Sequence, residues 1–107
     1  MRAGLLRNRV TLQKLIQERN EIGEAVETWV TVAHVWAEIR ALSGREWYEA
    51  RQLPEGEIST TIIVRFREDI DRTMRILHNA RKFNIVSVLD PDGRKKQLQL
   101  MCLEVEV

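Results

Sequence analysis

The stretch that decides the fold is EISTTIIVRFR, residues 57–67. Its side chains alternate between two faces with the two-residue period of a β-strand. Most of its residues are β-branched, and such side chains fit a pleated surface. One face carries Ile58, Thr60, Ile62, Val64 and Phe66. The other carries Ser59, Thr61, Ile63, Arg65 and Arg67. We therefore predict a strand here, with the Ile62 face toward the core.

Upstream of this strand, the pattern predicts a long hairpin. Apolar and polar residues alternate from Arg9 onward, and Val10 and Leu12 share one phase. The polar segment 18–24, ERNEIGE, contains Asn and Gly and is typical of a loop. The returning strand starts in the phase of Val26, Thr28, Val30 and Val32 and then takes the phase of Val35, Ala37 and Ile39. This change near residues 33–34 predicts a bulge or a bend.

Downstream, the sequence predicts three more strands. Residues 74–77 and 82–89 are joined by a tight connection around 78–80. Asp90-Pro91-Asp92-Gly93 has proline and glycine where a type I turn favours them. The last strand, 95–107, places Met101, Leu103, Val105 and Val107 on one face and Cys102, Glu104 and Glu106 on the other.

One short helix is expected between the hairpin and the 57–67 strand. Ser43 followed by Glu46 forms a capping-box pattern, and Pro54 discourages continuation beyond about two turns. The fold class is thus mainly β: a small antiparallel β-barrel or sandwich with one short α-helix in a long loop. We expect a single domain over 1–107, with 1–8 as an N-terminal arm and about 40–57 as a helix-bearing excursion.

The composition supports one globular domain. The 107 residues are 44% hydrophobic and 31% charged, with a formal net charge of +1. This total hides +4 in residues 1–17, −5 in 18–57 and +2 in 58–107. The sequence contains no run of 18 apolar residues, so it predicts no membrane span. A single cysteine, Cys102, excludes an intrachain disulfide framework and suits a reducing cytoplasm.

Candidate chemistry is sparse, so we expect no catalytic residues, no metal site and no cofactor. Cys102, His34 and His78 are the only residues of the Cys and His types, and their wide spacing is unlike a zinc site. Cys102 in an apolar strand fits packing better than catalysis, although an enzyme that uses this thiol is a third hypothesis. Glu104 and Glu106 share a strand face, as on any solvated strand.

The candidate assembly surfaces are the arm and the excursion. Thirteen of the 17 basic residues are arginine, whose planar fork suits carboxylate pairing at interfaces. Aromatic residues flanked by arginine on a short excursion are typical interface anchors, with a place in a local core as the alternative. The predicted interface residues are Arg2, Arg7, Arg9, Arg45, Trp47, Tyr48 and Arg51.

A single-strand nucleic-acid-binding barrel is the second hypothesis, because such barrels use aromatic platforms and basic grooves. The aromatic residues available for a platform are Trp29, Trp36, Phe66 and Phe83. Each of them lies within an apolar alternation, so we expect them in the core. Arg65 and Arg67 form a small basic strip, but acidic residues follow at once. Salt-dependent oligonucleotide binding by the isolated chain would favour this hypothesis.

The whole chain resembles the head–tail adaptor, or head-closure, proteins of long-tailed bacteriophages and their prophages. The resemblance rests on an ordered series of segments. They are MRAGLLRNRVTLQ (1–13), EIGE (21–24), TW (28–29), VWAEIR (35–40), LSGRE (42–46), IDRTMRI (70–76) and DP (90–91). The connection HNAR, residues 78–81, departs from the resemblance because glycine would be expected there.

The resemblance implies a small β-barrel that is a structural virion protein and not an enzyme. Copies would form a ring at the head–tail connector, close the DNA-filled head and provide the surface for tail attachment. The partners would be portal or adaptor proteins and tail-completion proteins, with non-specific contact to packaged DNA and none to a membrane. The protein would reside in the virion, and in the host cytoplasm during assembly. In isolation it could remain a monomer.

Overall fold

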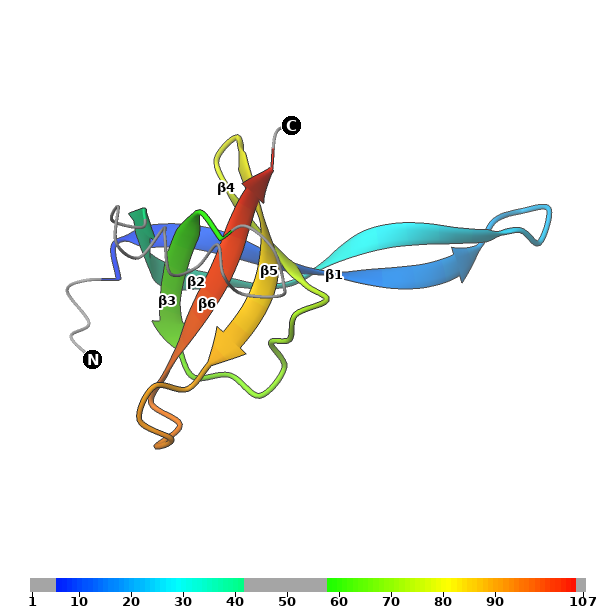
Figure 1. Cartoon of the computed structure of the whole chain (residues 1–107). Coiled ribbons are helices and arrows are strands. Elements are labelled where there is room, and N and C mark those ends of the chain that lie inside the picture. The colour runs from blue at the N-terminus through cyan, green and yellow to red at the C-terminus, as the bar shows by residue number, and fades with distance from the viewer. Residues whose placement is uncertain (1–5, 42–57, 106–107) are drawn as a thin grey trace.

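The computed structural model describes residues 6–41 and 58–105. Six antiparallel strands in these residues form a closed barrel (Figure 1). They are β1 (Asn8–Arg19), β2 (Ala25–Ala41), β3 (Thr60–Arg65), β4 (Arg75–His78), β5 (Arg81–Leu89) and β6 (Gln97–Val105). Their order around the barrel is β1-β2-β3-β6-β5-β4, and pairing of β4 with β1 closes it. The predicted mainly β class is confirmed, with the barrel and not the sandwich as its architecture.

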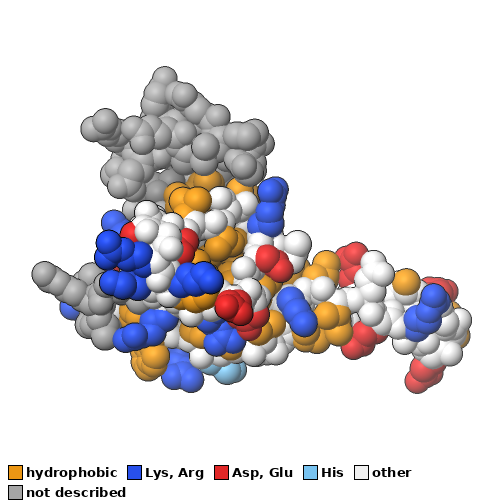
Figure 2. Space-filling model, turned by 90° about the horizontal axis from the view of Figure 1, so that it is seen from below, with side chains coloured by type: hydrophobic (Ala, Val, Ile, Leu, Met, Phe, Trp, Pro, Cys, Tyr) orange, Lys and Arg blue, Asp and Glu red, His pale blue; other side chains and the backbone are white. Residues whose placement is uncertain are grey.

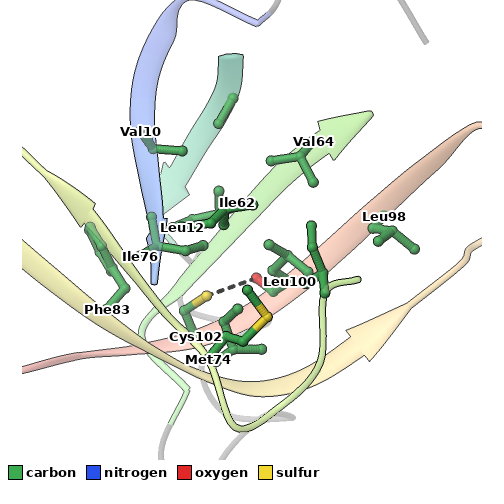
Figure 3. Packing of buried hydrophobic residues seen from close by; sticks show 13 residues of the cluster. Val10, Leu12, Ile62, Val64, Met74, Ile76, Phe83, Leu98, Leu100 and Cys102 are labelled. Carbon is green, nitrogen blue, oxygen red and sulfur yellow. Dashed lines mark hydrogen bonds between the residues drawn. The ribbon is translucent and has the colours of Figure 1, made fainter. Parts of the chain in front are cut away.

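The barrel core is built from one face of each strand (Figure 3). Leu12, Ile62, Ile76, Phe83 and Leu100 have no exposed surface. Ile62 and Val64 of β3 lie in this core, as the 57–67 pattern predicts. The opposite face of β3 is also shielded from solvent over part of its length, because Thr61 and Ile63 are buried. Solvent exposure on that face begins only at Arg65.

The inward face of β6 is set by Leu98, Leu100 and Cys102, which all belong to the core. Met101 and Leu103 lie on the other face and are half-buried. The alternation of Gln97 and Gln99 with Leu98 and Leu100 indicates this inward face, and both faces are apolar only from Met101 to Leu103. The expectation that Cys102 packs in the core is confirmed: it is fully buried, and its Sγ donates a hydrogen bond of 3.3 Å to the Leu100 carbonyl.

Burial makes the Cys102 thiol chemically inert, and this can be measured. Burial raises its pKa from 9.0 to about 12, which lowers the thiolate fraction about a thousandfold at any pH well below 9. We expect the native protein to react with DTNB at pH 8 at least about a thousandfold more slowly than the chain unfolded in guanidinium. Fast reaction of the native protein would contradict this and support a thiol enzyme.

Two predicted irregularities of the backbone are confirmed. Leu12 pairs with Ala33 while Gln13 pairs with Thr31, so Val32 is an extra residue that bulges from β2. This bulge explains the phase change in the sequence, because one extra residue reverses the faces of a strand. In the turn after β5, the Gly93 amide donates to the Asp90 carbonyl at 3.2 Å, and Gly93 has a φ of 67°.

The β4–β5 connection shows how the chain manages without the glycine expected there. Asn79 lies at a φ of 54°, in the left-handed region. Asparagine tolerates this region better than most residues with a Cβ atom. The tight connection predicted here is therefore formed by the two-residue turn 79–80, in which Asn79 adopts the positive φ expected of a glycine.

Some expectations fall outside the described residues. The predicted helix within 43–53 belongs to 42–57, and most of the predicted arm belongs to 1–5. Of the arm's last residues, Leu6 is buried and Asn8 already begins β1. The described part of the chain contains no helix that could cross a membrane.

Candidate assembly surface

The most conspicuous surface feature is a hairpin that extends well beyond the barrel (Figure 1). It consists of residues 14–30, the outer halves of β1 and β2. β1 pairs with β4 only over residues 11–13, and β2 pairs with β3 only over 37–41. Residues 14–30 therefore pair only with each other, and the molecule measures 50 Å along its long axis against 30 and 28 Å across.

This hairpin exposes apolar side chains that the barrel does not cover. Leu15 is 39% exposed, Val26 is 37% exposed and Ile22 is 76% exposed. Isolated two-stranded hairpins are marginally stable in water, and their unpaired edges invite association. A ribbon of this kind is expected to gain stability from a partner.

The tip of the hairpin is a well-defined turn. The Asn20 carboxamide Oδ1 accepts hydrogen bonds from the amides of Ile22 at 3.1 Å and Glu24 at 2.9 Å. The Asn20 amide donates to the Glu24 carbonyl, and the Gly23 amide, at a φ of 83°, donates to the Asn20 carbonyl. The Arg19 guanidinium donates to the Gly23 carbonyl at 2.7 Å. Ile22 is therefore presented from an ordered turn, between two glutamates.

The root of the hairpin is held against the barrel by Arg75 of β4. Its Nε donates to the Gln13 side chain at 2.8 Å, and its guanidinium lies 4.1 Å from the centre of the Trp29 ring. Arg75 is half-buried, and this burial lowers the pKa of its guanidinium. The hydrogen bond and the cation–π contact together fix the direction in which the hairpin leaves the barrel.

Replacing Arg75 with methionine should loosen the hairpin. We expect amide hydrogen exchange in residues 14–19 and 25–30 to accelerate about tenfold, with a loss of about 1–2 kcal/mol in the free energy of unfolding. Arg72→Met, at an exposed position of the β3–β4 connection, is the matched control and should leave this exchange unchanged. Equal exchange in the two variants would show that Arg75 does not brace the hairpin.

A hollow of about 280 Å³ lies on the barrel near the end of β3. Its apolar lining comes from Val35, Trp36 and Phe66, and its cationic lining from Arg65 and Arg67. The expectation that Trp36 is a core residue is wrong, because it is 50% exposed. Its partner in the β1–β2 pairing is Arg9, on the outer face of the barrel. Arg9 rather than solvent covers part of the ring, with its guanidinium 5.4 Å from the ring centre.

The remaining aromatic residues do not form a binding platform. Phe83 is fully buried, and Phe66 is partly buried against the core. Trp29 is half-buried beneath Arg75. The core expectation is thus confirmed for Phe83 and Phe66. The stack of exposed rings that a single-strand binder uses is not found among residues 6–41 and 58–105.

Charge divides the described residues into two regions (Figure 2). The barrel residues 6–13, 31–41 and 58–105 contain twelve basic and seven acidic side chains, a net charge of +5. The hairpin, residues 14–30, contains two basic and four acidic side chains, a net charge of −2. Net charges summed over consecutive segments of the sequence do not show this division. The inner parts of β1 and β2 belong to the barrel and their outer parts form the hairpin, so the boundary crosses both strands.

Several barrel cations are already paired, and others are exposed. Arg67 forms two hydrogen bonds with the Asp69 carboxylate, which raise the pKa of Arg67 and lower that of Asp69. Arg81 and Glu104 form the same kind of pair. The sequence analysis missed a run of three exposed cations at Arg94, Lys95 and Lys96, directly after the Asp90–Gly93 turn. Three consecutive basic residues directly after the predicted turn were a sufficient signal.

The structure places only two of the sequence-predicted interface residues. Arg7 and Arg9 are exposed at the start of β1, and Arg9 borders the hollow through Trp36. Arg2, Arg45, Trp47, Tyr48 and Arg51 lie outside the described residues. No three His, Cys, Asp or Glu side chains within the described ranges could hold a metal ion together. The arrangement is suited to contacts with other proteins.

A closed barrel with a projecting, partly apolar hairpin and a cation-lined hollow presents surfaces that suit contacts with other proteins. Residues 1–106 match the phage head completion protein family, and the chain belongs to this family. The resemblance described from the sequence is thereby confirmed. The protein is therefore a phage head completion protein.

Individual relatives agree with this assignment. The chain is 27% identical to the head completion protein gp7 of Enterobacteria phage HK97, over 95% of both chains. It is similar to the solution structure of protein SF1141 from Shigella flexneri 2a, with 33% identity, a TM-score of 0.78 and coverage of 97% and 96% of the two chains. A chain of the native gene transfer agent virion shares the fold, with 24% identity, a TM-score of 0.65 and coverage of 95% and 97%.

Proposed function

We propose that copies of this protein assemble as a ring at the head–tail connector, where the ring closes the DNA-filled head and offers the surface to which the tail attaches. Family membership over residues 1–106 is the observation that carries this proposal. Portal or adaptor proteins on the head side and tail-completion proteins on the tail side are the proposed partners. The role is non-enzymatic.

The surface of the barrel supports the assembly role. A ring requires that one surface of a subunit meets a different surface of its neighbour. The hairpin and the barrel differ in charge and shape, as such a contact requires. We assign assembly contacts to the arm, Arg2, Arg7 and Arg9, and to the excursion, Arg45, Trp47, Tyr48 and Arg51. We also propose that residues 1–107 form a single domain, with 1–8 as its arm and about 40–57 as its excursion.

Packaged DNA is the proposed non-protein contact. Arg94, Lys95 and Lys96 form an exposed basic segment, and the barrel as a whole is basic. Such residues attract phosphates without reading sequence, and the attraction weakens as salt is added. The contact would be an aid to closure of the head.

The test is an add-back experiment. DNA-filled heads made without this protein are mixed with the purified chain and then with tails, and joined particles are counted by electron microscopy. We expect joining only when the chain is added, and DNA inside the completed heads to become resistant to DNase. Heads that join tails equally well without the chain would contradict the proposed function.

A further inference from the structure

The hairpin tip carries one apolar side chain in an acidic setting. Ile22 is 76% exposed and belongs to the turn 20–24 between β1 and β2, which forms the far end of the projecting ribbon (Figure 1). Glu21 and Glu24 flank it, and both are exposed. The hydrogen bonds from Asn20 hold the turn in one shape, so binding would cost little conformational entropy. Such a preorganised tip resembles the apolar anchor of a protein interface, ringed by charge.

The hollow on the barrel combines an apolar lining with positive charge, whereas the hairpin tip combines an apolar side chain with negative charge. Val35, Trp36 and Phe66 provide an apolar lining, and Trp36 remains 50% exposed although Arg9 covers part of its ring. Arg65 and Arg67 line the same hollow, and Arg9 lies over the Trp36 ring. An apolar hollow among arginines fits an apolar side chain among carboxylates.

One molecule cannot join these two features. The hairpin tip lies at the right end of the molecule in Figure 1, whereas β3, which ends at Arg65 beside the hollow, lies at the left. The strand pairing at the root of the hairpin and the Arg75 contacts direct the tip away from the barrel. A contact between tip and hollow must therefore involve two copies, each offering a different surface, which is the head-to-tail arrangement of a ring.

We propose that the tip of the hairpin docks in the hollow of a second copy of this chain, with Ile22 against Trp36 and Phe66, and with Glu21 and Glu24 facing Arg65 and Arg9. This inference rests on the ring proposed above and names the contact between its neighbours. Burial of Ile22 supplies affinity, and the opposite charges set the orientation.

A photo-cross-link identifies what the tip touches. The photoreactive residue p-benzoylphenylalanine is placed at position 22, the protein is added to heads as in the add-back experiment, and the irradiated particles are analysed by mass spectrometry. We expect cross-links to residues 35–36 or 65–67 of another copy. Cross-links to a different protein, or to other parts of a second copy, would overturn the inference.

A small substitution tests the anchor without adding bulk. Ile22→Ser should reduce tail joining at least about tenfold, because an exposed hydrophobic anchor is lost while the fold is untouched. Leu89→Ser is the matched control, since Leu89 is an exposed apolar residue of β5 at 45% exposure, and it should join normally. Normal joining by Ile22→Ser would overturn the inference.

The two proposals fail in different ways. If the proposed function is wrong, the unchanged chain is not required for tail joining in the first experiment. If only this inference is wrong, the unchanged chain supports joining while the cross-link from position 22 leads elsewhere or Ile22→Ser joins like the unchanged chain.

Discussion

Replacing Phe83 with alanine should lower the free energy of unfolding by about 3–5 kcal/mol. Phe83 is among the largest fully buried side chains, and it lies directly across from Ile76 in the β4–β5 pairing. β4 is only four residues long, yet it closes the barrel by pairing with β1. Loss of the Phe83 phenyl ring would leave a cavity beneath β4, and β4 has the fewest other contacts to hold it in place.

This loss is large in relation to the whole. A domain of this size is stable by about 5–15 kcal/mol, so Phe83→Ala should remove a third or more of that stability. Guanidinium unfolding followed by circular dichroism measures the change. Trp36→Ala is the matched aromatic control, since Trp36 is 50% exposed, and it should cost less than about 1 kcal/mol. Equal losses in the two variants would contradict the assignment of the core.

Replacing Trp47 and Tyr48 together with alanine should reduce tail joining more than tenfold with little change in stability. Aromatic residues beside arginine contribute about 2 kcal/mol or more each when they anchor an interface, and 1.4 kcal/mol corresponds to tenfold in affinity. The add-back experiment measures joining, and thermal unfolding of the purified chain measures stability.

A conservative variant separates the two interpretations of these aromatic residues. Trp47→Phe with Tyr48→Phe keeps both rings and should retain most of the joining activity. A fall of more than about 10 °C in the Tm of the alanine variant would place the rings in a core and contradict the interface role.

The local patterns of the sequence were sufficient for the strands of the barrel. β-branched alternation located β3, and the change of phase near residues 33–34 located the bulge at Val32. Turn chemistry located the connection after Leu89, because proline and glycine have fixed places in a type I turn. Each of these features depends on a few neighbouring residues, and this is why the sequence reveals them.

Features that depend on distant residues were not predictable in the same way. Trp36 is a different case: after the bulge it is out of phase with Val35, Ala37 and Ile39, so the sequence pattern already indicated its outward position, and the core expectation overlooked this. The projecting hairpin arises because β1 and β2 are longer than the strands that pair with them, and the sequence does not reveal that mismatch. The hollow forms where β2 and the end of β3 meet, so it exists only in the folded barrel.

A reconstruction of the completed particle by electron cryomicroscopy tests the central claim most directly. The account predicts a ring of six-stranded barrels between the head and the tail, with the hairpin of each copy extending toward its neighbour. A junction without this barrel, or the barrel found at another place in the particle, would contradict it.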